Sequence, residues 1–92
     1  MTERIDVWAS PSVLVSFDGR VLEVFGFADA QRFHIAFLPR IVFVGKSRMS
    51  IRPQGGGGQY TFFYAVERRA ALERLAEHVH AAHGAWQPSF GD

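Results

Sequence analysis

The chain has 92 residues, of which 48% are hydrophobic and none is cysteine, and its formal net charge is +1. This length allows one domain over residues 1–92, and the lack of cysteine excludes both a disulfide framework and a thiolate metal site. Because the chain begins with charged residues and holds no apolar run as long as a signal peptide or a membrane span of about 20 residues, we expect a soluble, cytoplasmic protein.

Alternation of apolar and polar side chains predicts three strands in the first part of the chain, at residues 5–9, 12–17 and 21–25. Ser10-Pro11 separates the first two, because proline cannot donate a hydrogen bond to a sheet. Asp18-Gly19 lies between the second and third strands. It predicts a hairpin with a type I′ turn, in which both central residues have positive φ.

Four more strands are expected, at residues 32–38, 41–44, 47–52 and 59–65. Residues 41–44 are apolar at every position, as in a strand that is covered on both faces. In the two neighbouring strands, alternate apolar side chains are predicted to point inward, namely Phe33, Ile35, Phe37, Met49 and Ile51. The polar side chains between them are predicted to point outward, namely Arg32, His34, Arg48, Ser50 and Arg52.

Residues 66–83 have a helical period and predict a single C-terminal helix. One apolar stripe recurs at i, i+3, i+4 and i+7, formed by Leu72, Leu75, Ala76 and Val79. Such a stripe needs a second layer to cover it, and the preceding strands supply one. The helix lacks a Ser, Thr, Asp or Asn cap at its start. Gly84 is expected just beyond its end, in the left-handed conformation.

Three segments together resemble a pleckstrin-homology-like domain of the bacterial type. They are the SFDG hairpin, the RFHIAFLPRI stretch that leads into IVFV, and the QYTFFYAVERRAALERLAEHV join of strand and helix. The resemblance covers about residues 12–83. It implies an α+β, mainly β, fold with a partly open barrel of six to seven antiparallel strands, capped by one C-terminal helix through Leu72, Leu75 and Val79. It also implies binding or assembly instead of catalysis.

The first hairpin departs from the eukaryotic members that bind phosphoinositides. Those members use several basic residues around this hairpin, whereas here it offers only Arg20 beside Asp18. The family's lipid-binding route is therefore not expected in this chain.

Charge distribution indicates one candidate binding surface. Residues 30–65 carry five Lys or Arg side chains and no acid, whereas residues 1–29 have a net charge of −3. The predicted strands project Arg32 and His34 outward from one strand, and Arg48 and Arg52 outward from another. Guanidinium groups bind phosphate and carboxylate well. The alternative is that these side chains are merely solvated, or pair with acids such as Glu23.

Other motifs are weaker. Gly45-Lys46-Ser47 lacks the earlier glycine of a P-loop and precedes a predicted strand, not a helix. Glu77, His80 and His83 lie near one another on the predicted helix, but without a fourth ligand they would form only a weak metal site. We recognise no catalytic residue set and no ribonucleoprotein motif, so we expect no enzymatic activity, no cofactor and no nucleic-acid partner.

We therefore predict a non-enzymatic binding or assembly module whose partner is another protein or a second copy of the chain. The alternative is peripheral binding of anionic lipid through the basic strand face. The tail of residues 84–92 contains Trp86 and Phe90, which belong either to the core or to an interface.

Overall fold

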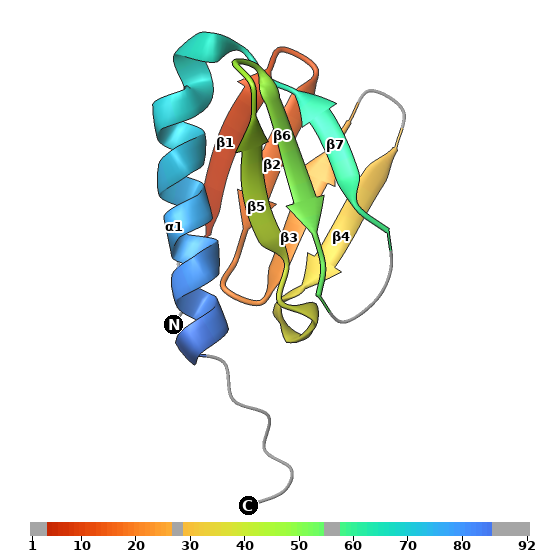
Figure 1. Cartoon of the computed structure of the whole chain (residues 1–92), viewed down its shortest axis with the longest axis vertical. Helices are drawn as coiled ribbons and strands as arrows, with labels where there is room; N and C mark the ends of the chain where they lie inside the picture. The colour runs from red at the N-terminus through yellow and green to blue at the C-terminus, as the bar shows by residue number, and fades with distance from the viewer. Residues whose placement is uncertain (1–3, 27–28, 55–57, 86–92) are drawn as a thin grey trace, which may run out of the picture.

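The computed structural model describes residues 4–26, 29–54 and 58–85, which form seven antiparallel strands in two sheets and one C-terminal helix (Figure 1). The first sheet contains β1 (Ile5–Ser10), β2 (Val13–Phe17), β3 (Val21–Phe25) and β4 (Ala30–His34), in that order. The second contains β5 (Arg40–Val44), β6 (Arg48–Arg52) and β7 (Tyr60–Phe63). A 3₁₀ turn, η1 (Ile35–Phe37), precedes β5, and a second, η2 (Val66–Arg68), precedes the helix α1 (Arg69–Ala85). The predicted α+β, mainly β, class is confirmed.

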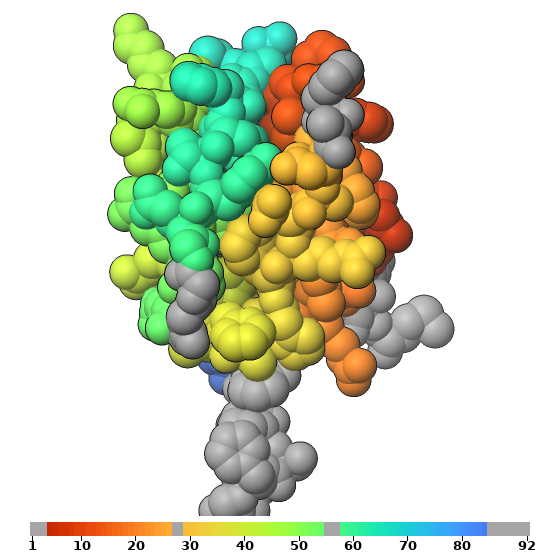
Figure 2. Space-filling view, turned by 90° about the vertical axis from the view of Figure 1, so that its right-hand side faces the viewer, coloured from red at the N-terminus to blue at the C-terminus, as the bar shows by residue number. Residues whose placement is uncertain are grey.

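The two sheets face each other, and α1 runs along one side of the pair, where it contacts β1 and β5 (Figure 1). Figure 2 shows the opposite side, where β7 and β4 are neighbours and the outer faces of the two sheets point in opposite directions. Within the described residues, strands pair only inside their own sheet, so the two sheets do not close into a barrel.

The core lies between the two sheets and the helix. The predicted helical stripe is confirmed, because Leu72, Leu75 and Val79 are 0% exposed and Ala76 is 5% exposed. The sheets contribute fully buried side chains that include Val15, Leu22, Val24, Met49 and Ile51. Burial of apolar side chains on one stripe of the helix holds α1 against both sheets.

The start of the helix is fixed by tertiary contacts in place of a capping side chain. Ala65, which precedes η2, provides no side-chain cap. Arg69 anchors the first turn of α1 instead, because its guanidinium lies over the Phe43 ring, 5.0 Å from the centroid, and donates to the Gly45 carbonyl at 3.4 Å. The end of the helix differs from the prediction. Gly84 lies inside α1, and its φ is not positive, since the helix continues to Ala85.

The strand predicted for residues 32–38 begins and ends earlier, at Ala30 and His34. The His34 Nδ1 atom accepts a hydrogen bond from the Ala36 N–H at 3.0 Å, which caps η1 and takes the next residues out of the sheet. Strand alternation no longer decides which side chains are buried there. Ile35 is buried as predicted, but Phe37 is 50% exposed, so its predicted inward position is wrong.

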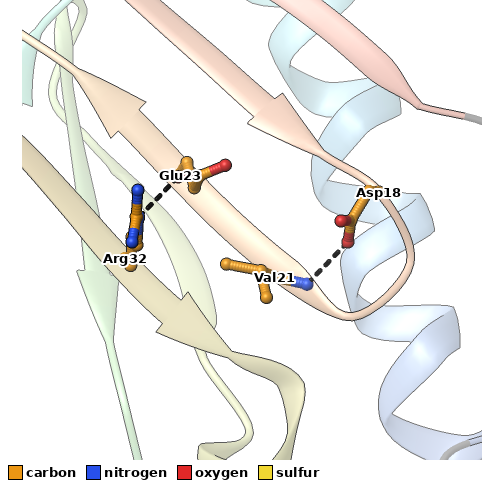
Figure 3. Close-up of polar contacts among 4 residues, drawn as sticks. All are labelled: Asp18, Val21, Glu23 and Arg32. Atoms are coloured by element: carbon orange, nitrogen blue, oxygen red, sulfur yellow. Dashed lines mark hydrogen bonds and ion pairs between the residues drawn. The ribbon is translucent and has the colours of Figure 1, made fainter.

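The hairpin between β2 and β3 is confirmed, but its predicted turn type is wrong. Positive φ occurs at Gly19 (96°) and not at Asp18. The Asp18 carboxylate instead accepts backbone N–H groups from Arg20 at 2.9 Å and Val21 at 2.8 Å, the second of which is drawn in Figure 3. These bonds, first that from Val21, lower the pKa of Asp18. The side chain thus stabilises the turn through backbone donors that would otherwise be free.

Two burial predictions in the second sheet also need correction. Alternation predicts Ser50 on the outside, yet it is 1% exposed. Its Oγ atom forms a hydrogen bond of 3.0 Å with the Thr61 Oγ1 atom on the neighbouring strand. The buried hydroxyl of Ser50 therefore has a hydrogen-bond partner. The apolar run at residues 41–44 predicts a strand covered on both faces, but only Ile41 is buried there, and the other three are half-buried. The predictions for Trp86 and Phe90 fall outside the described residues.

Candidate functional site

The predicted basic residues lie on two different sheets. Arg32 and His34 belong to β4 of the first sheet, and Arg48 and Arg52 belong to β6 of the second. All four are exposed. The register places Arg32 on the outer face of the first sheet, beside Glu23, while Arg48 and Arg52 lie on the outer face of the second. The four residues are therefore divided between two outer faces.

Arg32 and His34 each have a partner inside the molecule. The Arg32 Nε atom pairs with Glu23 Oε2 at 2.7 Å (Figure 3), as the sequence alternative of cross-strand pairing anticipated. The Arg32 side chain is 75% exposed, so this ion pair contributes less than about 1 kcal/mol to stability. His34 caps η1 through its Nδ1 atom. Both side chains therefore have hydrogen-bond partners within the molecule.

Basic side chains on the second sheet are more concentrated. Arg40 and Arg52 are direct cross-strand partners, and Arg48 lies opposite both Val44 and Phe63. The ion pairs found among the described residues join Arg4 to Asp6, Arg32 to Glu23 and Arg69 to Glu73, and so leave these three arginines out. Like charges directly opposite each other are unfavourable. The outer face of the second sheet is therefore a cationic surface.

A different surface, on the first sheet, combines exposure with shape. Trp8, Leu14 and Phe25 are aligned side by side across β1, β2 and β3. Trp8 is 52% exposed, Leu14 and Phe25 are half-buried, and Pro11 beside them is exposed. We call these four residues the Trp8 platform. The register of β1 and β2 shifts between Trp8 and Ser10, so the regular pairing of the two strands is interrupted directly after Trp8.

Two open hollows flank the Trp8 ring. One, of about 430 Å³, is lined by Trp8, Pro11, Ser12, Leu14, Phe25 and Gly26. The other, of about 240 Å³, is lined by Trp8, Ser10, Pro11, Ala65, Glu67 and Arg68. The second hollow therefore brings the start of the helical region next to the Trp8 platform. An exposed indole between two depressions offers both an anchor and adjoining space for a partner's side chains.

Sequence reasoning places Trp8 in the first strand but does not select it as a site. The sequence does indicate that Trp8 is exposed, because in residues 5–9 Asp6 and Trp8 alternate with apolar side chains that face the core. This pattern indicates a tryptophan on the solvent side of a strand. The alignment with Leu14 and Phe25 depends on the register of two hairpins, which alternation alone does not give.

Acidic side chains lie on the same outer face, one row away from the Trp8 platform. Asp6, Ser16 and Glu23 are aligned across the same three strands. A hydrogen bond from the Ser16 hydroxyl, followed by the ion pair with Arg4 at 2.9 Å, lowers the pKa of Asp6. These residues form a polar border for the Trp8 platform.

The two helical histidines considered as metal ligands bind backbone groups instead. His80 Nε2 accepts a hydrogen bond from the Ile41 N–H at 3.0 Å, and His83 Nε2–H donates to the Pro39 carbonyl at 2.7 Å. Burial, then the nearby His83 and Arg40, lower the pKa of His80. In residues 4–26, 29–54 and 58–85, no group of three or more His, Asp or Glu side chains is arranged to hold a metal ion.

The helices in the described part of the chain are too short and too polar to cross a membrane. Comparison of the chain with protein-family models, curated proteins and solved structures finds no match. The function of the chain is therefore inferred from its own geometry.

Proposed function

We propose that this chain is a non-enzymatic protein-binding and assembly module with a pleckstrin-homology-like fold, and that the Trp8 platform is its binding surface. The order of elements supports the fold assignment: a four-stranded sheet, a three-stranded sheet and then one C-terminal helix. The observation that supports the function most directly is the half-exposed indole of Trp8 between two hollows.

The composition of the Trp8 platform suits a protein partner. Tryptophan is among the residues that most often dominate the energy of protein interfaces, and such anchors lie in apolar centres bordered by polar groups. Here the indole stands beside Leu14 and Phe25, and the row of Asp6 and Glu23 borders them. The three strands that carry these side chains are paired in one sheet, so their backbone is already ordered before a partner binds, which limits the entropy lost on binding.

Photo-crosslinking tests this proposal. A benzoylphenylalanine replacing Ser12, which is exposed and lines the larger hollow beside Trp8, is expected to form covalent adducts with the partner in cells. The same group replacing the exposed Glu77 serves as the positional control. The captured protein is then purified, and its Kd is measured by calorimetry. Trp8→Ser is expected to raise the Kd roughly 30-fold, since hot-spot residues contribute about 2 kcal/mol or more.

Phe37→Ser is the matched control for the Kd measurement, because Phe37 is 50% exposed and Trp8 is 52% exposed. Phe37 is carried by η1 and does not line either hollow beside Trp8. We expect the Phe37→Ser variant to bind as the unmodified chain does. Equal affinities of the Trp8→Ser variant and the unmodified chain would contradict the proposal.

Anionic lipid is the second candidate ligand, and the cationic outer face of the second sheet favours it. Arg40, Arg48 and Arg52 lie exposed on this face, outside the three ion pairs found among the described residues. Vesicle sedimentation is expected to show binding to anionic lipid that weakens with salt and is lost on joint Arg48→Ala and Arg52→Ala substitution. Equal binding to neutral and anionic vesicles would exclude this function.

A further inference from the structure

We infer that His80 is a pH-sensitive latch between α1 and the edge of β5, whose hydrogen bond to the Ile41 N–H forms while the imidazole is neutral and breaks when the imidazole is protonated. The latch lies away from the Trp8 platform, because His80 is near the end of α1, whereas the hollows beside Trp8 reach the residues that precede the helix.

The geometry of the hydrogen bond defines the protonation state. Ile41 belongs to β5, the edge strand of the second sheet, and its N–H points away from β6 toward the helix, where it meets His80 Nε2 at 3.0 Å. Because an N–H can only donate, Nε2 must accept, and the proton of the neutral ring is on Nδ1. Protonation places a second N–H at Nε2, directly facing the Ile41 N–H, and the hydrogen bond is lost.

His83 makes the opposite kind of contact and is not expected to respond in the same way. Its Nε2–H donates to the Pro39 carbonyl at 2.7 Å. A protonated imidazole still donates from both nitrogens, so this bond survives acidification. The two rings lie 5.5 Å apart. A protonated ring is thus expected to lose the hydrogen bond of His80 to Ile41 and to keep the hydrogen bond of His83 to Pro39.

Burial and the two nearby basic side chains favour the neutral form of His80. Arg40 on β5 and His83 on the same helix lower its pKa, after burial, which is the largest cause. Glu77, one turn earlier on α1, forms no ion pair with it in the described structure. β1, which also contacts α1, contributes Asp6, which is held by Arg4 and Ser16 on the outer face of its sheet.

The remaining elements that pack on α1 are η2 and η1. η2 carries Glu67 and Arg68, but it precedes the first residue of α1, whereas His80 lies near the other end of the helix. η1 itself contains no titratable residue, but His34 caps it and accepts the Ala36 N–H at Nδ1. Protonation of His34 would also break a hydrogen bond, so the experiment must separate the two histidines.

The sign of the pH dependence follows from the direction of the shift. The folded chain binds the proton at His80 less readily than a free histidine with the usual pKa of 6.5. The His80–Ile41 hydrogen bond is therefore fully formed above pH 6.5, and it is lost as the pH falls through the lowered pKa of His80. Release leaves the Ile41 N–H at the edge of β5 open to water.

NMR on the full chain tests the latch. The amide resonance of Ile41 and the ring nitrogens of His80 are followed from pH 8 to pH 5, and both are expected to shift with one shared midpoint below 6.5. His80→Gln should abolish the shift of Ile41, because the Gln carbonyl oxygen takes the place of Nε2 as an acceptor but does not titrate in this range.

Two variants serve as matched controls. His83→Gln keeps a donor for the Pro39 carbonyl, and His34→Asn keeps an acceptor for the Ala36 N–H, so both variants are expected to retain the titration of Ile41. An Ile41 resonance that stays constant while His80 titrates would overturn the inference. So would a titration that persists in the His80→Gln variant or disappears in the His34→Asn variant.

Discussion

Leu75→Ala is expected to lower the free energy of unfolding by about 2–5 kcal/mol, the range found for removal of a fully buried leucine side chain. Leu75 is 0% exposed and lies in the middle of the stripe that α1 turns toward the sheets. Domains of this size are stable by only about 5–15 kcal/mol, so the loss is a large part of the total. Chemical denaturation followed by circular dichroism measures it.

Glu77→Ala is the control, because Glu77 is exposed on the same helix and forms no ion pair in the described structure. Its free energy of unfolding should stay within about 0.5 kcal/mol of the unmodified chain. A similar small change for Leu75→Ala would mean that the helix is not packed as described. The comparison thereby tests whether the two sheets and α1 form one cooperative core.

Much of this architecture follows from the period of the apolar residues. Alternation and the continuous apolar run at residues 41–44 locate the strands, and the stripe of Leu72, Leu75, Ala76 and Val79 locates the helix and its buried face. These features depend on neighbours in the sequence, and local backbone geometry fixes which side chains share a face. The general class of the fold could therefore be predicted without any structural knowledge.

Three of the incorrect predictions have a different origin, which is a specific side-chain hydrogen bond. His34 ends a strand by bonding to the Ala36 N–H, and Asp18 sets the turn through two backbone donors. Ser50 is buried because Thr61 on the next strand satisfies its hydroxyl. Polar residues compete with regular backbone pairing, and a periodic pattern of hydrophobicity does not describe that competition.

Candidate sites are harder to predict than elements, because a site depends on which strands pair. Arg32 and Arg48 both project outward, as expected, but their strands belong to different sheets. Trp8 is recognisable as an outward residue, yet its neighbours Leu14 and Phe25 come from the pairing register. The sequence predicts His80 as a solvated helix residue, whereas in the structure it accepts a hydrogen bond from Ile41 at the edge of β5. Which residues of distant segments lie side by side is set by long-range pairing, and the sequence of a single segment does not predict it.

Replacing glycine by alanine at two positions is expected to change stability in opposite directions. Gly19→Ala should lower the free energy of unfolding by about 1–2 kcal/mol, because its φ of 96° is unfavourable for any residue with a Cβ atom. Gly84→Ala should raise it by up to about 1 kcal/mol, since alanine favours the helix and its added Cβ atom would meet nothing within 4 Å. Thermal and chemical denaturation measure both.

Gly84 is the more informative of the two positions, because the sequence and the structure give opposite expectations for it. If Gly84 were the left-handed residue beyond the end of a helix, as the sequence pattern suggests, alanine would destabilise the chain. In the structure Gly84 is inside α1, which continues to Ala85. A stabilising Gly84→Ala substitution would support this longer helix, because alanine is favoured inside a helix and disfavoured at a left-handed position beyond its end.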